Sequence, residues 1–189
     1  TISDEDSKVY KIDKQGKVIR FFTVNGEDLE GITVIDSTRL AVILERSREV
    51  VVIDTLGKEL KRKRFDLKGK LNEGLEGICF DTNKKDFYFV NEKLPGLLIK
   101  TDSNFAEIFK KELKIAKDYS DISFVEDDST LWLLSDESKK IIQTDLSGKK
   151  IIEYSINVEQ PEGLAVDYKN KKVFVVCDKK EELYEFNLP

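Results

Sequence analysis

The sequence predicts an all-β protein built from repeated units of short strands. An acidic residue stands directly before a short apolar run four times, at spacings of 46, 45 and 41 residues; these acids are Glu30, Glu76, Asp121 and Glu162. The apolar runs have the length of strands, are rich in Val, Ile, Phe and Tyr, and show no sustained helical period. Units of four strands that recur at such a period are typical of the blades of a β-propeller.

Each blade is expected to contain four antiparallel strands, which we name A to D in chain order. Strand A follows the acidic residue described above. Strand B is an apolar run that ends in a second acid, strand C ends in Asp or Asn, and strand D follows a turn such as 14–16, 55–57 or 146–148. The acids that end strand B are Asp4, Glu45, Glu92, Asp136 and Asp178.

Five units account for residues 1–189 as one domain, with approximate blades 1–24, 25–68, 72–114, 118–156 and 158–189. The first unit begins at strand B and the last ends after strand C, so the first and last blades are incomplete. Because ring closure needs the strands that are absent, we expect about 20–25 further residues upstream in the parent protein, an estimate from the blade period.

Composition excludes several functional classes. The net charge of −5 argues against nucleic acid as a partner, because phosphate contacts need clustered Lys and Arg. No apolar run reaches the length of a transmembrane segment. The chain has no His, which excludes His-dependent triads, His-ligated zinc and imidazole acid–base catalysis. Cys79 and Cys177 each lie inside an apolar run and are expected to be buried free thiols.

The acids of strands A and B are expected to meet at one mouth of the central channel. Strand B is antiparallel to strand A, so the start of A and the end of B lie at the same face. Tight A–B turns would place Glu30 opposite Glu45, Glu76 opposite Glu92, Asp121 opposite Asp136, and Glu162 opposite Asp178. Like charges in such positions destabilise a sheet and raise each other's pKa values.

A bound hard cation would offset this repulsion. Calcium takes six to eight oxygen ligands, whereas magnesium demands a tight octahedron, so calcium fits a ring of carboxylates better. We expect the strand-A acids Glu30, Glu76, Asp121 and Glu162 as ligands, and the strand-B acids Glu45, Glu92, Asp136 and Asp178 as further candidates. The alternative is local neutralisation by Arg46, Lys93 and Lys179, which directly follow strand-B acids.

Several other features have structural explanations. The glycine after three of the strand-A acids permits close backbone approach or a bulge, with or without a metal. The basic segment 58–64 is expected on an outer strand, where Lys blocks edge-to-edge pairing. Trp132 is expected in the core. The loop 91–96 lies near the mouth and is expected either to line a site or to be a plain turn.

Two stretches, 73–81 and 87–97, carry the pattern Leu-Glu-Gly-Ile…Asp followed by Val-Asn-Glu-Lys-Leu-Pro-Gly-Leu. Together with 133–137 and 161–167 they resemble the SdiA-regulated family of bacterial propellers, which are similar to NHL repeats. The resemblance implies a five-bladed propeller with a calcium site, located in the periplasm, secreted, or held at the membrane by an N-terminal anchor upstream. Asp121 departs from the family's Glu-Gly pattern.

The predicted function is therefore a calcium-binding, extracytoplasmic interaction module whose acidic channel mouth binds an unidentified protein or small molecule. The alternative is a metal-dependent hydrolase, distantly similar to gluconolactonase and paraoxonase propellers. In that case the cation would polarise an ester or lactone carbonyl, and Glu92 or Asp136 would act as the base. A third hypothesis is a scaffold without metal.

Overall fold

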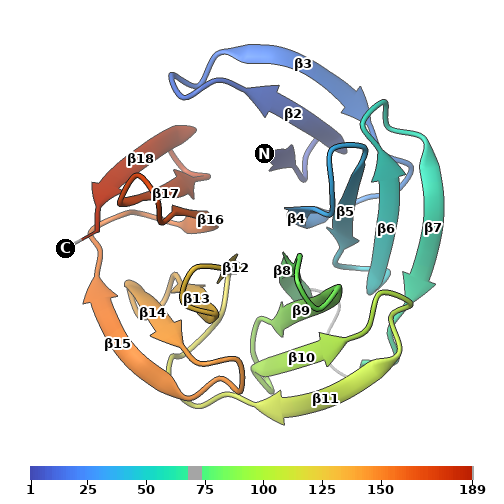
Figure 1. Ribbon diagram of the computed structural model, residues 1–189. Helices are drawn as coiled ribbons and strands as arrows, with labels where there is room; N and C mark the ends of the chain where they lie inside the picture. Colours follow the sequence, from blue (N-terminus) through green and yellow to red (C-terminus); the bar gives the residue numbers. More distant parts are fainter. Residues whose placement is uncertain (68–73, 189) are drawn as a thin grey trace.

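The computed structural model describes residues 1–67 and 74–188, and it confirms the predicted five-bladed β-propeller (Figure 1). All strand pairs within the five sheets are antiparallel. The described residues contain no helix, and therefore none with the length and apolar character needed to cross a bilayer. The expected blade boundaries at 68, 72 and 189 lie outside the described residues.

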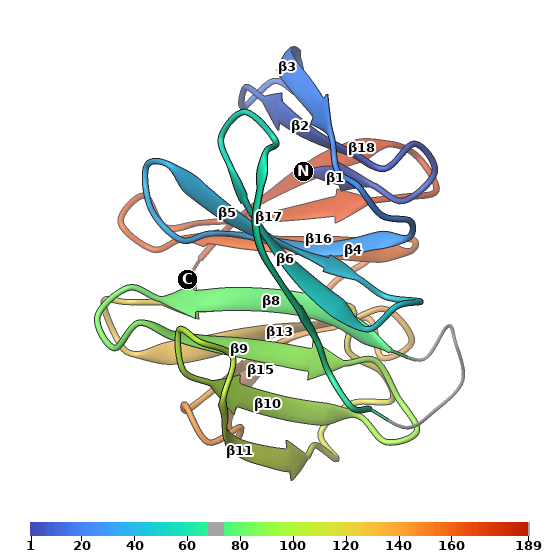
Figure 2. The same cartoon turned by 90° about the vertical axis from the view of Figure 1, so that its right-hand side faces the viewer.

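The strands follow one another from the channel outward in every blade. The first blade contains β1 (Ile2–Ser3), β2 (Lys8–Ile12) and β3 (Val18–Thr23), and the second β4 (Leu29–Val34), β5 (Arg39–Leu44), β6 (Glu49–Asp54) and β7 (Glu59–Arg64). The third contains β8 (Leu75–Asp81), β9 (Asp86–Asn91), β10 (Leu97–Thr101) and β11 (Glu107–Glu112), a succession that Figure 2 shows from the side. The fourth contains β12 (Asp121–Val125), β13 (Thr130–Ser135), β14 (Lys140–Thr144) and β15 (Lys150–Ser155). The fifth contains β16 (Pro161–Asp167), β17 (Lys172–Cys177) and β18 (Glu182–Asn187).

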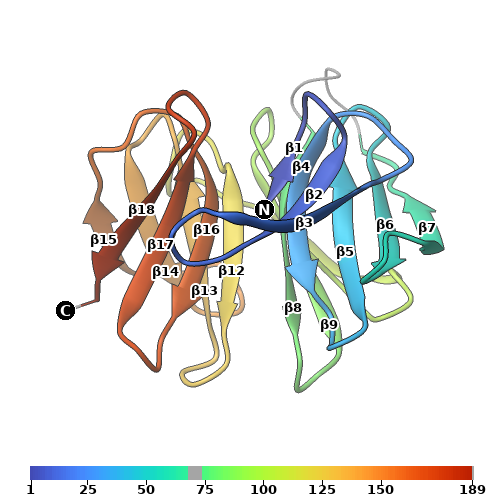
Figure 3. The ribbon, with the colours of Figure 1, turned by 90° about the horizontal axis from the view of Figure 1, so that it is seen from above.

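The first and last blades have three strands each, as predicted. The first blade has the strand order β1-β2-β3 and the last blade β16-β17-β18, which agrees with a first blade that begins at strand B and a last blade that ends at strand C. Figure 3 shows the first blade between the fifth and the second blades. The innermost strands are β4, β8, β12 and β16, which surround the channel in Figure 1.

The core lies between neighbouring blades. The second strands β5, β9 and β13 are covered on both faces, so their sequences are nearly continuous apolar runs rather than alternating patterns. Four clusters of buried residues join the first blade to the second, the second to the third, the third to the fourth and the fourth to the fifth. No such cluster among the described residues joins the fifth blade to the first. The ring therefore has one seam without a shared core.

Individual packing predictions are confirmed. Cys79 and Cys177 are buried free thiols, and Trp132 is buried in the core between the fourth and fifth blades. The basic segment forms β7, an outer strand whose residues are mostly exposed. Its Lys and Arg side chains stand on the outer edge of the blade, where they oppose pairing with another sheet.

Candidate metal centre at the channel mouth

Three of the four strand-A acids lie in β-bulges at the channel mouth. In the second blade the register with β5 shifts between Leu29 and Ile32, so that β4 carries one extra residue around Glu30. The register shifts in the same way around Glu76 in β8 and around Glu162 in β16. A bulge leaves one residue out of the ladder and bends the strand locally. The bulged acids therefore do not follow the regular alternation of side chains between the two faces of the sheet.

The predicted cross-strand opposition of the acids is wrong, both in the three blades with a bulge and in the fourth blade, where the position of the turn alone sets the register. In the fourth blade, which has no bulge here, Asp121 pairs with Leu134 and not with Asp136. In the other three blades the backbone N–H of the strand-B acid bonds to a carbonyl two residues before the strand-A acid. These bonds run from Glu45 to Asp28 (3.0 Å), from Glu92 to Gly74 (2.9 Å) and from Asp178 to Gln160 (3.1 Å). The two rows are thus offset along the strands.

The glycine after each bulged acid lies against the neighbouring blade in two of three cases. A Cβ atom on Gly31 would lie 2.4 Å from the carbonyl oxygen of Glu76, and one on Gly77 would lie 2.7 Å from the Cα of Asp121. Both glycines therefore permit the backbones of successive innermost strands to touch. Gly163 differs, because its nearest neighbour is the Val176 side chain of its own blade, at 3.4 Å.

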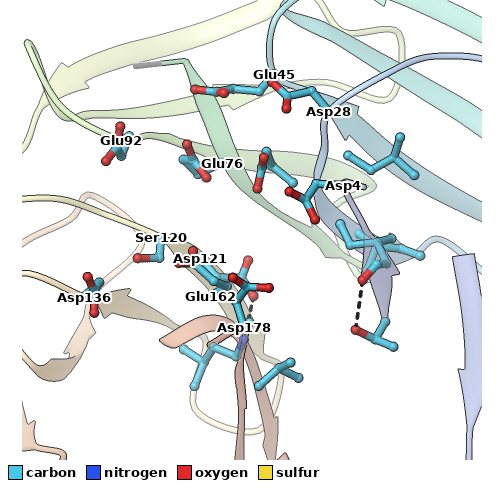
Figure 4. Close-up of a pocket in the computed structure, with 18 of the residues that line it drawn as sticks. Asp4, Asp28, Glu45, Glu76, Glu92, Ser120, Asp121, Asp136, Glu162 and Asp178 are labelled. Carbon is cyan, nitrogen blue, oxygen red and sulfur yellow. Dashed lines mark hydrogen bonds between the residues drawn. The ribbon is translucent and has the colours of Figure 1, made fainter. Parts of the chain in front are cut away.

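Carboxylates from the second and third blades converge at the mouth despite this offset (Figure 4). Oxygen atoms of Asp28, Glu30 and Glu45 lie within 4.8 Å of one another, and so do oxygen atoms of Glu45, Glu76 and Glu92. Glu45 belongs to both groups, which we call the paired carboxylate clusters. Its side chain is buried, with 4% of the residue exposed.

The position of Glu45 is fixed by a contact between blades. Its Oε1 accepts a 2.8 Å hydrogen bond from the backbone N–H of Gly74, at the start of the third blade. Glu45 is therefore the residue that the two clusters share, and a hydrogen bond from the third blade holds it in place.

The other four candidate ligands line the same cavity but lie apart from these clusters. Asp121, Glu162, Asp136 and Asp178 form no further group of three carboxylates at this spacing within residues 1–67 and 74–188. Asp121 accepts hydrogen bonds from the backbone N–H groups of Ile122 and Leu164, both at 2.7 Å. Because Leu164 belongs to β16, Asp121 links the fourth and fifth blades through both of its oxygens.

Burial and mutual repulsion raise the pKa values of the acids at the channel mouth. Burial, with Coulombic contributions from Glu45 and Asp28, raises the pKa of Glu30 to about 8. Burial, together with the nearby Glu30 and Glu45 carboxylates, raises the pKa of Glu76 well above its ordinary value. Glu162 has a pKa raised to about 7 by burial and by Asp136 and Asp178. A cation at the mouth would stabilise the ionised forms of these groups.

Basic side chains neutralise only some of the acids that end strand B. Lys93 lies 2.6 Å from Glu92, and Arg46 lies 3.1 Å from Asp28 rather than pairing with the Glu45 that precedes it. Lys179 pairs with Glu159, at 3.5 Å, instead of Asp178. In the described parts of the chain no ion pair reaches the strand-A acids Glu30, Glu76 or Glu162. Among the described residues the row nearest the axis therefore has no ion pair with a basic side chain, whereas Glu92 and Asp136 of the strand-B row have one each.

Four further acids of the cavity lining were not predicted as ligands: Asp4, Asp28, Asp118 and Glu137. Asp4 follows β1 as a strand-B acid should, and Asp28 stands two residues before Glu30, so both carried a positional signal. Asp118 is buried and accepts hydrogen bonds from the Ser135 hydroxyl and from the Glu137 N–H, the latter at 3.0 Å. No sequence pattern marked Asp118, because it lies outside a strand.

The cavity that contains these acids has a volume of about 690 Å³ and two kinds of wall. Carboxylates cover the mouth, and Arg46 and Lys93 are the basic residues of its lining. Apolar side chains, among them Ile12, Phe174 and Leu183, line the part that extends toward the first and fifth blades. The oxygen-only donors of the paired carboxylate clusters fit a hard cation such as calcium, with backbone carbonyls and waters completing its shell.

Fold and site together define a β-propeller with an acidic channel mouth. The family model described as SdiA-regulated matches residues 1–187, and the chain belongs to this family. This confirms the resemblance that the Leu-Glu-Gly-Ile pattern indicated.

Solved structures show the same fold at low sequence identity. The nidogen/laminin complex matches with a TM-score of 0.69 and 14% identity, over 99% of this chain and 74% of that chain. Streptogramin B lyase matches with a TM-score of 0.59 and 16% identity, over 98% of this chain and 63% of its own. A protein of unknown function from Bacteroides caccae matches with a TM-score of 0.63 and 12% identity, over 96% and 65%. This chain therefore spans about two thirds of the length of these propellers.

Proposed function

We propose that this propeller is a calcium-binding interaction module that works outside the cytoplasm. The observation that carries the proposal is the pair of carboxylate clusters that share the buried Glu45 and lie within 4.8 Å. Three carboxylates so close together, without a basic partner on the strand-A side, repel one another when they are ionised, and a bound cation would offset this repulsion. Calcium supplies that charge and accepts an irregular set of oxygen ligands.

A site of this kind suits a protein that is exposed to extracellular calcium. The ligands come from separate segments of two blades, within strands and next to strand ends, and not from one contiguous loop. Extracellular modules bind calcium with Kd values on the order of 10⁻⁴–10⁻³ M. Family membership supports an exported location by resemblance. Fractionation of cells that express the natural protein tests the location, and recovery of the protein in the cytoplasmic fraction would contradict it.

Thermal unfolding in EDTA and in excess calcium tests the metal site. With a Kd on the order of 10⁻⁴ M, 10 mM calcium is about 100 times the Kd and stabilises the folded state by about 2.7 kcal/mol. For a domain of this size that corresponds to a rise in Tm of roughly 5–10 °C. Magnesium at the same concentration should give a smaller rise, because its octahedral shell fits the clusters less well.

Glu45→Gln and Asp127→Asn form a matched pair for this experiment. Glu45→Gln removes the charge shared by both clusters and keeps an oxygen that accepts the Gly74 hydrogen bond. Asp127→Asn removes one charge from the turn between β12 and β13, at the opposite end of the channel from the clusters. The calcium-dependent rise should be lost in Glu45→Gln and kept in Asp127→Asn. Equal responses from the two variants would contradict the assigned site.

The second candidate function is a metal-dependent lactonase or esterase. Glu162 favours it, since a carboxylate with a pKa of about 7 can exchange a proton near neutral pH. Streptogramin B lyase shares the fold, which shows that propellers of this shape carry catalytic sites. A panel of lactones and esters with calcium, repeated on Glu76→Gln and Glu162→Gln, separates the functions. Hydrolysis by the unchanged protein that both variants abolish would favour the enzyme. Background rates in the unchanged protein and in both variants would favour the binding module.

A further inference from the structure

The outer edge of the second blade carries charge of one sign, which distinguishes it from the other outer strands. Segment 58–64, which contains β7, has five basic residues and one acid, whereas the whole chain has a net charge of −5. By contrast, Arg20 is the charged residue of β3, and β11 and β15 contain as many acids as bases. Protection of an edge against pairing needs charge, but not a surplus of one sign. The fold therefore does not account for the surplus of positive charge on β7.

Most of this positive charge has no counter-charge in the protein. Arg62 binds Glu49 at 2.7 Å and Glu59 at 2.8 Å, and so neutralises the acid of the segment. Within residues 1–67 and 74–188 the other four basic residues of the segment form no ion pair; we call them the basic strip, and they are Lys58, Lys61, Lys63 and Arg64. The basic strip is therefore available to an external anion.

The side chains of the basic strip lie on both sides of the blade edge. Lys63 pairs with Val50, which packs against the third blade, so Lys63 and Lys61 lie on that side. Arg64 alternates with Lys63 and lies on the side of the first blade. Lys61, Lys63 and Arg64 are exposed, and β7 is the outermost element on the right of Figures 1 and 3. Their long side chains can therefore reach a surface that touches this edge.

Two exposed leucines accompany the basic strip. Leu56, in the turn before β7, is 77% exposed, and Leu60 is 50% exposed. The backbone N–H of Leu56 donates to Asp54, and the residues that make the same bond in the other turns of this kind are polar: Gln15, Asn104 and Ser147. The turn therefore does not require an apolar residue at position 56. Leu60 lies at a register shift that recurs in the other outer strands, so Leu56 is the leucine that departs from the repeat.

We propose that the basic strip, with Leu56 and Leu60, docks on the surface of a bilayer that contains anionic lipids. Basic side chains are attracted to the negative surface of such a bilayer, and exposed apolar side chains enter its interface. An apolar residue among the lysines favours a bilayer over a nucleic acid, because phosphate backbones are bound by charge alone. The inference goes beyond the proposed function and needs no bound calcium.

The acidic channel mouth is compatible with docking at this edge. Figure 1 looks along the channel and shows β7 on the outside of the ring, so a flat surface that touches β7 lies beside the channel and leaves its mouth open. Glu30 on β4 is three strand spacings from β7 in the sheet order, which is roughly 14 Å. The Debye length at 0.15 M salt is about 8 Å, so repulsion between the mouth acids and the lipids is largely screened.

Co-sedimentation with vesicles in EDTA tests this proposal. The vesicles are phosphatidylcholine with or without phosphatidylglycerol, which supplies the anionic headgroup. The protein should sediment with the phosphatidylglycerol vesicles although its own net charge is negative, and it should not sediment with phosphatidylcholine alone. Salt at about 0.5 M should release it, because the attraction is electrostatic.

Charge-reversal variants locate the contact. Lys58→Glu combined with Lys63→Glu should weaken vesicle binding by roughly tenfold or more. Lys149→Glu combined with Lys180→Glu is the matched control, since it changes the net charge equally at two exposed lysines of the fourth and fifth blades. The control should bind as the unchanged protein does. Equal losses in the two double variants would overturn the proposal, because net charge rather than the basic strip would then govern binding.

A second pair of variants separates a bilayer from a general polyanion site. Leu56→Ser should weaken vesicle binding by about fivefold or more, because it removes an apolar side chain that enters the interface. Ile151→Ser, at a residue that is 57% exposed on β15, should leave binding unchanged. Unchanged binding by Leu56→Ser, together with competition from a DNA duplex, would show a general polyanion surface instead.

Spin-labelled lipid locates the docked surface on the unchanged protein, so this part of the test does not depend on the folding of any variant. Amide resonances of residues 55–64 should broaden most. Broadening centred on the channel mouth, or no binding to phosphatidylglycerol vesicles, would overturn the proposal. Calcium titration without vesicles is a separate measurement, so its failure would remove the metal site and leave the docking surface untouched.

Discussion

Gly77 is the residue whose substitution tests the packing of the ring most sharply. A Cβ atom at this position would lie 2.7 Å from the Cα of Asp121 and 2.7 Å from the N of Ile122. Both atoms belong to the backbone of β12, so no side-chain rotation relieves the clash. The innermost strands of the third and fourth blades would have to separate.

The expected cost follows from two opposing effects. Overpacking a core position typically costs about 1–3 kcal/mol. Replacing Gly by Ala also reduces the entropy of the unfolded chain, which stabilises by about 0.4–1 kcal/mol when the backbone conformation suits Ala. Gly77→Ala should therefore destabilise the fold by about 1–2 kcal/mol, a fall in Tm of roughly 2–8 °C for a domain of this size.

Gly163→Ala is the matched control. Its Cβ atom would meet the Val176 side chain at 3.4 Å, an ordinary contact, so only the entropic stabilisation remains. We expect an unchanged or slightly higher Tm. Circular dichroism melts of both variants and of the unchanged protein, all in EDTA, make the comparison. Equal losses of stability at the two positions would refute the reasoning that strand contact at Gly77, rather than the motif itself, requires glycine.

Three further predictions concern stability and reactivity. In EDTA the Tm should fall by several degrees as the pH rises from about 5 to 8. The folded pKa values of Glu30 and Glu162 are about 8 and 7, above the ordinary value of 4.5, so the folded protein holds protons that the unfolded chain has lost. A Tm that rises over this range would contradict the raised pKa values. Asp121→Ala should lower the free energy of unfolding by about 2 kcal/mol, because it leaves the Ile122 and Leu164 N–H groups without their acceptor. Its calcium affinity should change less than that of Glu45→Gln. Isothermal titration would contradict this if Asp121→Ala lost as much calcium affinity as Glu45→Gln or more. Cys79 and Cys177 should react with a thiol reagent only at the rate of unfolding, since both are buried, and fast modification of the native protein would disprove their burial.

The fold followed from the sequence because each blade repeats the same chemistry. The acid of strand A, the acid after strand B and the turn before strand D recur in order wherever the blade contains those strands, and the structure confirms this order of strands although not the predicted register of the acids. Incomplete terminal blades could also be predicted, since the first unit begins at a B-type strand and the last ends at a C-type strand.

The details of the site could not be predicted from strand alternation. A register calculation assumes one residue opposite one residue, and the bulges at Glu30, Glu76 and Glu162 break that assumption. In the fourth blade the turn is centred between residues 127 and 128, which places Asp121 opposite Leu134 without any bulge. Asp121 occupies a regular strand position and bonds to the backbone of the fifth blade, a role that no local pattern reveals. Asp118 reaches the mouth from outside any strand. Contacts between blades, which are distant in sequence, decide all of these positions.

Isothermal titration of calcium into the metal-free protein tests the central claim most directly. The paired carboxylate clusters predict saturable binding with a Kd on the order of 10⁻⁴–10⁻³ M. Glu45→Gln should weaken this binding by about tenfold or more, since it removes one charge from both clusters, and Asp127→Asn should bind as the unchanged protein does. No saturable heat at millimolar calcium, or identical titrations for the two variants, would contradict the claim that these carboxylates hold the cation.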